Sequence, residues 1–375
     1  MITKADKGKT TVNIDNTEYK KTLEFINNTI LKLNKDPTNN FKKKVIENLK
    51  QGELIINKNQ TKHPIQRKPQ VPTLKAKIKL HKIGTPIRPV VNNINEPTYK
   101  LAKIHLKNTE VIYIQLQYQY NVKNSTNLAQ DLKNIIIKDK YQLITFDIKD
   151  LYVNIPIEET INITKALLMA QNNNNNNITL QMLKLIKTML QQNYFAFNGN
   201  IYQPKKGISM GSPLSGEIAE IFLYHLEKNN LKQIMDNKNI ILYTRYVDDL
   251  IIIYNSEHIS ADNSNEYLNN IHPSLMFTPT YEINKTVSFL DLLITRQHTT
   301  LDIDIFIKPT TTDTTINYHS NHPLEHNTAA YRFLINRMLS LPLTNSNKKK
   351  EWNFTKTMAR NNNLPLHHID KLHKT

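Results

Sequence analysis

The sequence predicts an α+β fold in which an antiparallel sheet is backed by helices. Branched and aromatic residues dominate two runs on either side of a polar turn, at 240–253, and a further run at 141–148, which is typical of strands buried on at least one face. Two such strands joined by a tight polar turn form a β-hairpin. The segments 157–170, 179–193 and 217–228 are expected to be the backing helices.

The turn of this hairpin, within Tyr246–Asp249, carries two adjacent carboxylates. Like charges side by side on a buried hairpin repel each other and cost stability. A divalent cation would offset that cost, because Mg²⁺ prefers carboxylate oxygens together with substrate phosphates. The run at 141–148 holds a third carboxylate, so we expect Asp147, Asp248 and Asp249 to meet at the ends of adjacent strands. There they would hold two divalent ions about 4 Å apart, as two-metal phosphoryl transfer requires.

Composition bounds the class of protein. The chain has 375 residues, of which 39% are hydrophobic, which is enough for a sizeable core divided into lobes. A formal net charge of +17, spread along the chain, favours nucleic acid as the partner, with an anionic membrane surface or a generally basic proteome as alternatives. The absence of cysteine excludes disulfides, thiolate zinc sites and cysteine nucleophiles. No apolar run approaches the roughly 20 residues of a membrane-spanning helix, so we expect a soluble, intracellular protein.

The sequence also predicts a basic hairpin. Along 74–82 apolar residues alternate with basic ones, including Lys79, which predicts a strand with one basic face. Gly84–Pro86 is expected to be a turn, and 87–91 a returning strand that carries Arg88. A guanidinium fork matches phosphate oxygens, so this hairpin suits a triphosphate. A solvated amphipathic hairpin is the alternative interpretation.

The other segments are assigned from composition and turn signals. The asparagine run Asn172–Asn177 cannot bury enough apolar surface to order itself, so we expect a surface insertion there. Gly207–Ser215 holds two glycines before a helix and would let the backbone approach a ligand closely, although many loops contain two glycines. In the first half of the chain the remaining expectations are a short strand at 10–14, mostly helix over 17–59, a proline-containing crossing at 63–73 and helices within 97–140. In the second half they are a hairpin at 195–202 turning at Asn198–Gly199, a partly helical stretch at 255–275 and a strand pair at 287–294 and 301–307. We also expect a helix at 324–341, with Ala330, Phe333, Leu334, Met338 and Leu341 on one face, and a basic, asparagine-rich tail at 344–375.

In this order the motifs resemble those of a reverse transcriptase. The motifs that carry the resemblance are Arg88–Pro89 in the basic hairpin, Phe146–Asp147 with Tyr152 downstream, Met210–Ser215, Tyr246–Asp249 and Phe289–Asp291. Among reverse transcriptases the chain is most similar to the Penelope-like retroelement branch, whose relatives include telomerase. The stretches that indicate this branch are Ala5–Gly8, Leu80–Lys82 with Arg88–Pro89, Asp147–Pro156, methionine at position 210 where most other families have glutamine, Phe289–Asp291, and Asn321–Leu324.

The resemblance implies a right-hand polymerase with fingers at 1–140, a catalytic palm at 141–300, and a thumb with a basic tail at 301–375. It implies RNA-directed DNA synthesis, in which a primer 3′-hydroxyl is extended with dNTPs by two-metal phosphoryl transfer. The implied cofactor is a pair of Mg²⁺ ions. The implied partners are an RNA template, a DNA primer and dNTPs, without a membrane, and the expected location is the nucleus.

The resemblance also assigns the catalytic residues. Asp147, Asp248 and Asp249 would be catalytic and would bind Mg²⁺, and the backbone carbonyl of Ile148 would add a ligand. Tyr152 would lie under the incoming sugar and obstruct a 2′-hydroxyl, which favours deoxynucleotides. The alternative interpretation of Tyr152 is an ordinary packed aromatic residue.

Six further residues are expected, by resemblance, to contact the nucleotide or the nucleic acid. They are Lys79 and Arg88 for the triphosphate, Gly211 and Ser212 for the template, and Phe289 and Leu290 for the primer end. For Phe289 and Leu290, burial in the core of a strand is the alternative interpretation.

The sequence departs from the family pattern in several places. Penelope-like elements commonly carry a GIY-YIG endonuclease after the polymerase, and this sequence shows no such motif. Ile78 stands where the family usually has proline, and Gly216–Glu217 replace more apolar residues. We therefore expect an endonuclease-deficient copy, a fragment of a longer gene, or a host-retained relic that binds nucleic acid without catalysis. RNA-templated RNA synthesis is a further alternative, which Tyr152 disfavours.

Overall fold

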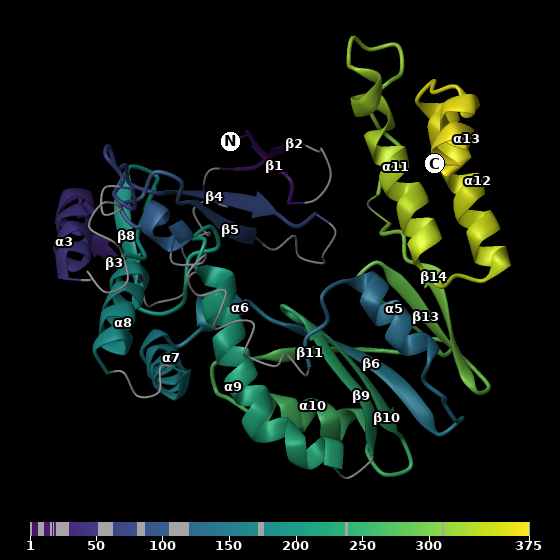
Figure 1. The fold of residues 1–375 in the computed structure, drawn as a ribbon, viewed down its shortest axis with the longest axis horizontal. Helices are drawn as coiled ribbons and strands as arrows, with labels where there is room; N and C mark the ends of the chain where they lie inside the picture. Colours follow the sequence, from purple (N-terminus) through teal and green to yellow (C-terminus); the bar gives the residue numbers. More distant parts are fainter. Residues whose placement is uncertain are drawn as a thin grey trace. The chain divides into compact units, whose positions relative to one another are not determined.

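The computed structural model has an α+β fold with antiparallel sheets, as predicted (Figure 1). It describes residues 2–6, 11–15, 17, 19, 30–51, 63–80, 87–104, 120–171, 176–236, 239–309 and 311–374. The chain divides into two compact units, and each is described by itself. The first unit comprises Met1–Gln119, Lys149–Lys232 and Ile271–Met276, and the second comprises Tyr120–Ile148, Gln233–Asn270 and Phe277–Thr375. The division into fingers, palm and thumb stays a prediction.

A four-stranded antiparallel sheet forms the centre of the second unit. In spatial order its strands are β11 (Phe277–Tyr281), β6 (Tyr141–Ile148), β10 (Asp249–Asn255) and β9 (Ile240–Tyr246). The predicted strand at 141–148 and the predicted hairpin are both confirmed. Pairing on both sides leaves β10 buried along almost its whole length, which explains its unbroken apolar run. The sequence does not predict β11, because a proline interrupts it and its last residues are exposed.

An extended segment lies along the other edge of β9. The backbone amide of Arg245 donates to the Tyr120 carbonyl at 2.8 Å, and the amide of Val122 donates to the Arg245 carbonyl at 2.9 Å. The chain then enters helix α5 (Ser125–Lys133), whose apolar face packs into the core of this unit. That core includes Leu128, Leu132, Leu143, Ile251, Ile253, Leu292, Ile294 and Ile303. Helix α10 (Ala261–Asn270) confirms the helical content expected within 255–275.

The predicted strand pair at 287–294 and 301–307 is wrong in its first member. The structure has three strands here, β12 (Thr286–Phe289), β13 (Leu292–Gln297) and β14 (Thr300–Ile305), paired antiparallel in that order. The chain reverses at Leu290, which has a φ of 57°. The run from Val287 to Ile294 is apolar except for Ser288 and Asp291, and Asp291, which follows Leu290 in the turn, is a turn-forming residue that the interpretation as one strand overlooks.

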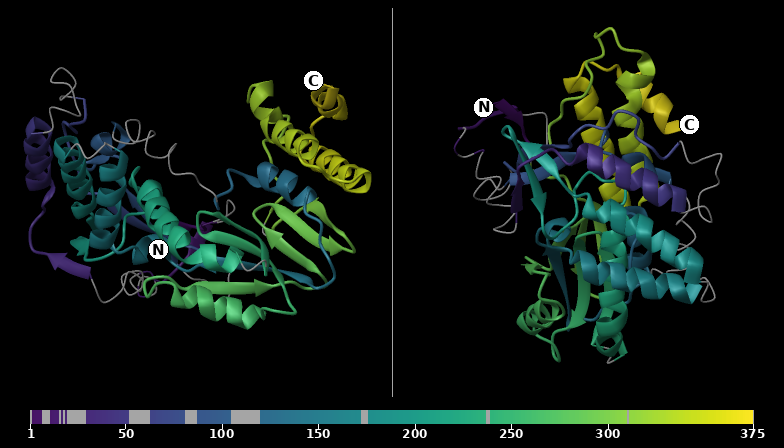
Figure 2. Two further views of the ribbon diagram at one scale, coloured as in Figure 1. Left: turned by 60° about the horizontal axis from the view of Figure 1, so that its bottom comes forward. Right: turned by 90° about the vertical axis from the view of Figure 1, so that its left-hand side faces the viewer.

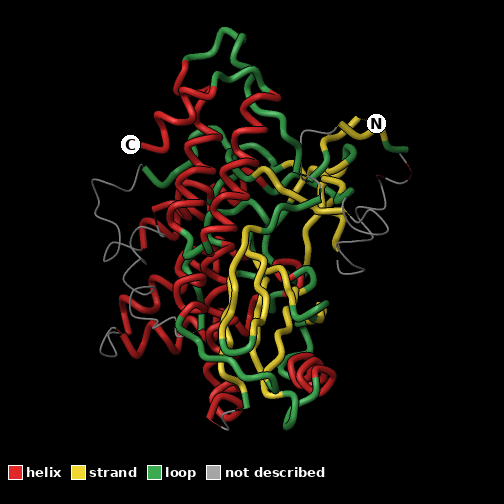
Figure 3. Tube along the Cα trace, turned by 90° about the vertical axis from the view of Figure 1, so that its right-hand side faces the viewer, coloured by secondary structure: helices red, strands yellow, loops and turns green. Residues whose placement is uncertain are grey.

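The last part of the second unit contains three helices, α11 (Leu324–Ser340), α12 (Asn345–Asn361) and α13 (Leu366–Lys374), drawn in red beside the C-terminus in Figure 3. Much of the basic, asparagine-rich segment 344–375, to which the sequence analysis assigns no secondary structure, is helical. The buried face of α12 includes Glu351 and Thr355, so its apolar periodicity is weak. The predicted face of α11 is also wrong at Phe333, which is 62% exposed and lies under the Arg337 guanidinium.

The first unit contains a five-stranded sheet. Its spatial order is β3 (Ile30–Leu33), β8 (Asn200–Pro204), β7 (Phe195–Phe197), β4 (Thr73–Ile78) and β5 (Ile87–Asn92). The β4–β5 pairing confirms the basic hairpin, whose turn lies outside the described residues. The β7–β8 turn at Asn198 and Gly199 has positive φ at both positions, as a type I′ turn requires. A separate pair, β1 (Ile2–Lys4) and β2 (Thr11–Asn13), precedes this sheet in the chain.

The helices of the first unit are α3 (Thr38–Gln51), the short α6 (Leu151–Asn154), α7 (Ile157–Gln171), α8 (Asn176–Gln191) and most of α9 (Ser215–Asp236). Helices α3, α7 and α8 pack side by side, as both views of Figure 2 show. The asparagine run lies partly outside the described residues, and its last two members open α8. Among the described helices, none combines the length and apolar character that a membrane crossing requires.

Candidate active site

The β9–β10 hairpin closes through a turn that contains a strained residue. Tyr246 pairs with Asp249, so Val247 and Asp248 form the loop between them. Val247 has a φ of 57°, which a β-branched residue adopts only under strain. A positive φ at the first loop residue is the requirement of a type II′ turn, where glycine is the usual choice. Such a residue costs about 1–3 kcal/mol and persists only where its surroundings impose it.

Two hydrogen bonds in the second unit fix this turn. The backbone amide of Ile148, at the end of β6, donates to the Asp248 carbonyl at 2.8 Å. The Nη1 atom of Arg245 donates to the Val247 carbonyl at 3.0 Å, and the Arg245 side chain is 1% exposed. Both loop carbonyls are therefore held from within the protein.

The register of β6 and β10 places two carboxylates opposite each other. Asp249 pairs directly with Asp147, so both side chains leave the same face of the sheet. Since Ile148 and Asp248 form a hydrogen-bonded pair, Asp147 and Asp249 form a non-hydrogen-bonded pair, in which the Cα atoms are about 4.5 Å apart. Like charges directly opposite each other destabilise a sheet. All three aspartates are half-buried, so solvent screens this repulsion only in part.

The donor set fits Mg²⁺, although the side chains are not gathered into a cluster. Within the part of the chain that the structure describes, no three His, Cys, Asp or Glu side chains are placed to hold one ion. Three like charges in one place favour rotamers that separate them, and a cation between them reverses that preference. Carboxylate and carbonyl oxygens on one strand and one turn are the ligand types that Mg²⁺ takes. The backbone thus places Asp147 of β6 opposite Asp249 of β10, and Asp248 precedes Asp249 in the loop between β9 and β10.

In the first unit, the glycine-rich turn is packed tightly against its neighbours. A Cβ atom on Gly211 would lie 1.9 Å from the Val91 carbonyl oxygen, and one on Gly207 would lie 2.3 Å from the Val153 carbonyl oxygen. Neither position can carry a side chain without movement of the backbone. Ser212, which follows Gly211, is half-buried.

Tyr152 lies in α6, directly beside this turn. Its carbonyl accepts a hydrogen bond from the Ile208 amide at 2.7 Å, and the Ile155 carbonyl accepts one from the Gly207 amide at 3.1 Å. The Tyr152 side chain is half-buried. The structure therefore brings Tyr152 and the 207–212 segment together within the first unit.

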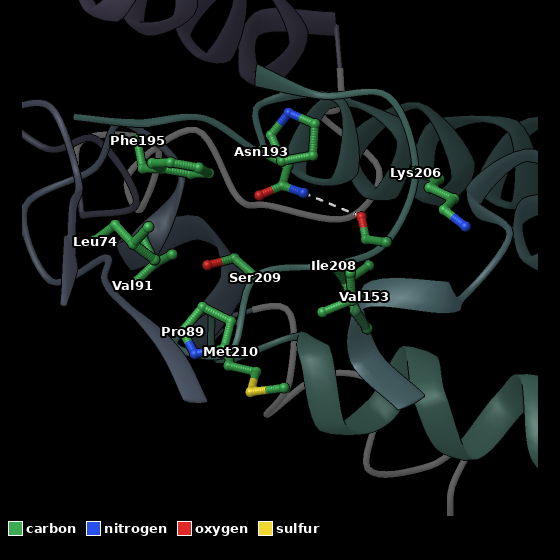
Figure 4. Close-up of a pocket in the computed structure, with 12 residues that line it drawn as sticks. Leu74, Pro89, Val91, Val153, Asn193, Phe195, Lys206, Ile208, Ser209 and Met210 are labelled. Carbon is green, nitrogen blue, oxygen red and sulfur yellow. Dashed lines mark hydrogen bonds between the residues drawn. The ribbon is translucent and has the colours of Figure 1, made fainter. Parts of the chain in front are cut away.

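A small cavity of about 30 Å³ lies behind the turn (Figure 4). Its walls come from β4, β5, β7 and the 207–210 segment, and they are mostly apolar. Asn193 donates to the Gly207 carbonyl at 3.0 Å at one side of this space, as the dashed line in Figure 4 marks. The volume is that of about one water molecule, so the cavity is too small for a nucleotide.

A buried polar network anchors the same turn to the end of β5. The Asn93 side chain donates to the Glu96 carboxyl, and its Oδ1 accepts a hydrogen bond from Ser209 Oγ at 2.9 Å. Thr98 donates to the other Glu96 oxygen at 3.2 Å. Burial raises the pKa of Glu96 to about 7, although both hydrogen bonds lower it. Sequence reasoning missed Asn93 and Glu96, because a polar pair after a strand is typical of any loop.

Glu96→Gln is expected to flatten the pH dependence of the unfolding free energy between about pH 4.5 and 7. The folded-state pKa of Glu96 lies above its ordinary value of 4.5, so the folded protein binds the extra proton in this window and loses stability as the pH rises through it. The full loss in wild type is about 3 kcal/mol. Urea denaturation of both proteins at the two ends of this pH window measures the change in unfolding free energy. An equal change in wild type and Glu96→Gln would contradict the assignment.

The triphosphate candidates lie on or beside the β4–β5 hairpin. Arg88 is in β5 opposite Lys77, and its Nη1 lies 3.3 Å from an Asp6 carboxylate oxygen. The Arg88 side chain is 39% exposed, so part of the guanidinium faces solvent. Lys79 follows the end of β4 and is half-buried.

The primer candidates lie in the β12–β13 turn of the second unit. The Phe289 side chain is 3% exposed and belongs to the core. Leu290 is half-buried against that core and has a positive φ. Contact with a primer at this turn would therefore use the backbone or Leu290, because the Phe289 ring is enclosed.

Two parts of the chain match known protein families. Residues 79–275 match the family model described as reverse transcriptase (RNA-dependent DNA polymerase). Residues 314–374, which span α11 to α13, match the model described as an animal helix-turn-helix domain. No curated protein matches the chain.

Similar solved structures include two yeast telomerases. Telomerase from Candida albicans, in complex with a fragment of telomeric RNA, has a TM-score of 0.59 and 12% identity over 100% of this chain and 67% of that chain. Apo telomerase from Candida tropicalis has a TM-score of 0.59 and 12% identity over 99% of this chain and 67% of that chain. At this identity the likeness shows a shared fold alone.

Proposed function

Because the chain belongs to the reverse transcriptase (RNA-dependent DNA polymerase) family, we propose that it extends a primer 3′-hydroxyl with dNTPs on an RNA template. The observation that carries this proposal is the direct pairing of Asp147 with Asp249 beside a strained turn that holds Asp248. A fold gains nothing from opposed carboxylates at this position, whereas phosphoryl transfer uses them.

In this proposal each residue of the site has a defined task. Asp147, Asp248, Asp249 and the Ile148 carbonyl would hold two Mg²⁺ ions, which when bound lower the pKa of the 3′-hydroxyl and neutralise the leaving pyrophosphate. Lys79 and Arg88 would bind and orient the triphosphate as hydrogen-bond donors. The 207–212 turn and Ser212 would position the template strand, and the β12–β13 turn at Leu290 the primer end.

We further propose that the chain comes from a Penelope-like element and works in the nucleus, with residues 301–375 as the thumb. The sequence stretches that resemble this branch and the telomerase-like fold support the first point. Exposed cations along α12 and α13, including Lys349, Lys371 and Lys374, support contact between the thumb and a nucleic-acid backbone.

Primer extension with the purified full chain tests the proposed function. The chain, an RNA template annealed to a DNA primer, dNTPs and Mg²⁺ should yield extended DNA. Absence of extension under conditions in which the protein binds the primer–template would refute it. That result would favour a non-catalytic nucleic-acid-binding protein, which the ungathered carboxylates of the described residues and the net charge of +17 also suit.

Tyr152→Ala is expected to lower the preference for dNTPs over NTPs by at least about tenfold, because it removes the ring that would meet a 2′-hydroxyl. The ratio of kcat/KM for the two nucleotide classes measures this. Tyr152→Phe keeps the ring and serves as the control, with an unchanged ratio. If the alanine variant keeps the wild-type ratio, Tyr152 is an ordinary packed residue and RNA synthesis regains support.

A further inference from the structure

The geometry points to Arg245 as the positioning residue that holds the Val247–Asp248 turn in its strained conformation and thereby keeps the carboxylates in metal-binding register. This inference rests on the proposed function, since it concerns the same site. It adds a residue that neither the motif nor the resemblance assigns. Arg245 would act through the backbone of the turn and not by touching the substrate.

The first step is the strain itself. The turn carries valine at a position where the positive φ of 57° suits glycine. A valine there is an outlier, and the relaxed alternative is a turn in which φ is negative and the strands splay. Because Asp248 follows Val247, relaxation of Val247 would move the Asp248 carbonyl and carboxylate together. The strain must therefore be balanced by contacts that the relaxed turn would lose.

The second step is the placement of Arg245. Its backbone is held on both sides, since it pairs with Leu250 in β10 and exchanges hydrogen bonds with Tyr120 and Val122. Its side chain is 1% exposed and donates from Nη1 to the Val247 carbonyl at 3.0 Å. Because the Arg245 backbone is fixed and its side chain is buried, the guanidinium has a restricted position. It therefore constrains the turn, and not the reverse.

The third step is the chemistry of burial. Taking a guanidinium out of water is costly unless good hydrogen bonds replace its hydration. The neighbouring inward positions of β9 and β10 are apolar or hydroxyl-bearing, so an apolar residue would suit the strand as well. The guanidinium is planar and carries several hydrogen-bond donors in a fixed arrangement, so it is well suited to hold a carbonyl in one position. We infer that the buried Arg245 guanidinium supports the turn through its hydrogen bond to the Val247 carbonyl.

The test is a double-mutant cycle on the full chain with Mn²⁺ affinity as the readout. Mn²⁺ replaces Mg²⁺ because its binding is measured directly by electron paramagnetic resonance without nucleotide or nucleic acid. Arg245→Gln in the wild-type background should weaken Mn²⁺ binding roughly 10- to 100-fold, as the loss of an outer-shell partner does. In the Val247→Gly background, where the turn needs no support, the same change should weaken binding by no more than about twofold.

Equal effects of Arg245→Gln in both backgrounds would overturn the inference, because Arg245 would then act independently of the strain. A wild-type chain that does not bind Mn²⁺ would overturn it as well. If Arg245→Gln does not fold, Arg245→Lys, which keeps the buried cation but loses the fork, takes its place in the cycle with the same criterion. Wild type that binds Mn²⁺ but extends no primer would refute the proposed function and leave this cycle interpretable.

Discussion

Asp147→Asn is expected to abolish primer extension while it leaves the metal-free protein slightly more stable than the wild type. Loss of a metal ligand removes several kcal/mol of transition-state stabilisation, so the rate should fall about a thousandfold or more. The same change removes the repulsion between Asp147 and its cross-strand partner Asp249, which is worth about 0.2–1 kcal/mol. Opposite effects on activity and on stability distinguish a catalytic carboxylate from a structural one.

The effect of added Mg²⁺ on stability is a second test of Asp147 as a metal ligand. Wild-type protein should gain stability as Mg²⁺ is added, because the ion binds only the folded state, and Asp147→Asn should gain much less. Urea denaturation with and without Mg²⁺ measures both gains. Asp139→Asn, an exposed carboxylate in the loop before β6, is the matched control and should extend primers like the wild type. A destabilised, Mg²⁺-responsive Asp147→Asn protein would contradict the assignment of Asp147.

The sequence was sufficient to predict the hairpin and β6 because their signals are local. Branched apolar runs, a polar turn and two carboxylates that folding does not need are all visible in the residues themselves. The direct pairing of Asp147 with Asp249 depends on register, which is set by pairing along the whole of β6 and β10. Only coordinates show that register. The sequence predicts that the three carboxylates meet, whereas among the described residues no three acidic side chains are placed to hold one ion.

Arg245 and Leu290 show what pattern reasoning cannot reach. Arg245 is a single charged residue in an apolar strand, and the sequence alone does not say whether its side chain reaches solvent or the turn. Leu290 adopts a positive φ that its residue type disfavours, and the single turn-forming residue beside it, Asp291, is a weak signal for the break between β12 and β13. Both are positions at which tertiary contacts override local preference. Arg245 lies in β9 two residues before Val247, and Leu290 is itself a proposed site residue.

Gly211→Ala is expected to destabilise the first unit by roughly 1–3 kcal/mol and to weaken template binding, because the added methyl group would overlap the backbone of β5. Its Cβ would lie 1.9 Å from the Val91 carbonyl oxygen and 2.9 Å from Asn93 Oδ1. The φ of Gly211 is not in the left-handed region, so the cost is steric and not conformational. Since Val91 is paired in β5, the turn must move away, and the Ser209–Asn93 hydrogen bond is lost with it.

Gly216→Ala is the matched control for this prediction. Nothing lies within 4 Å of a Cβ at Gly216, which is in the first turn of α9, so alanine there should stabilise the protein by up to about 1 kcal/mol. Urea denaturation gives the two stabilities, and the affinity for a primer–template measured without dNTPs gives the binding term. If Gly211→Ala matched Gly216→Ala in both measurements, the turn would not be pressed against β5, and its proposed contact with the template would lose its structural basis. If stability fell while affinity for primer–template stayed unchanged, the turn would serve the packing of the first unit alone.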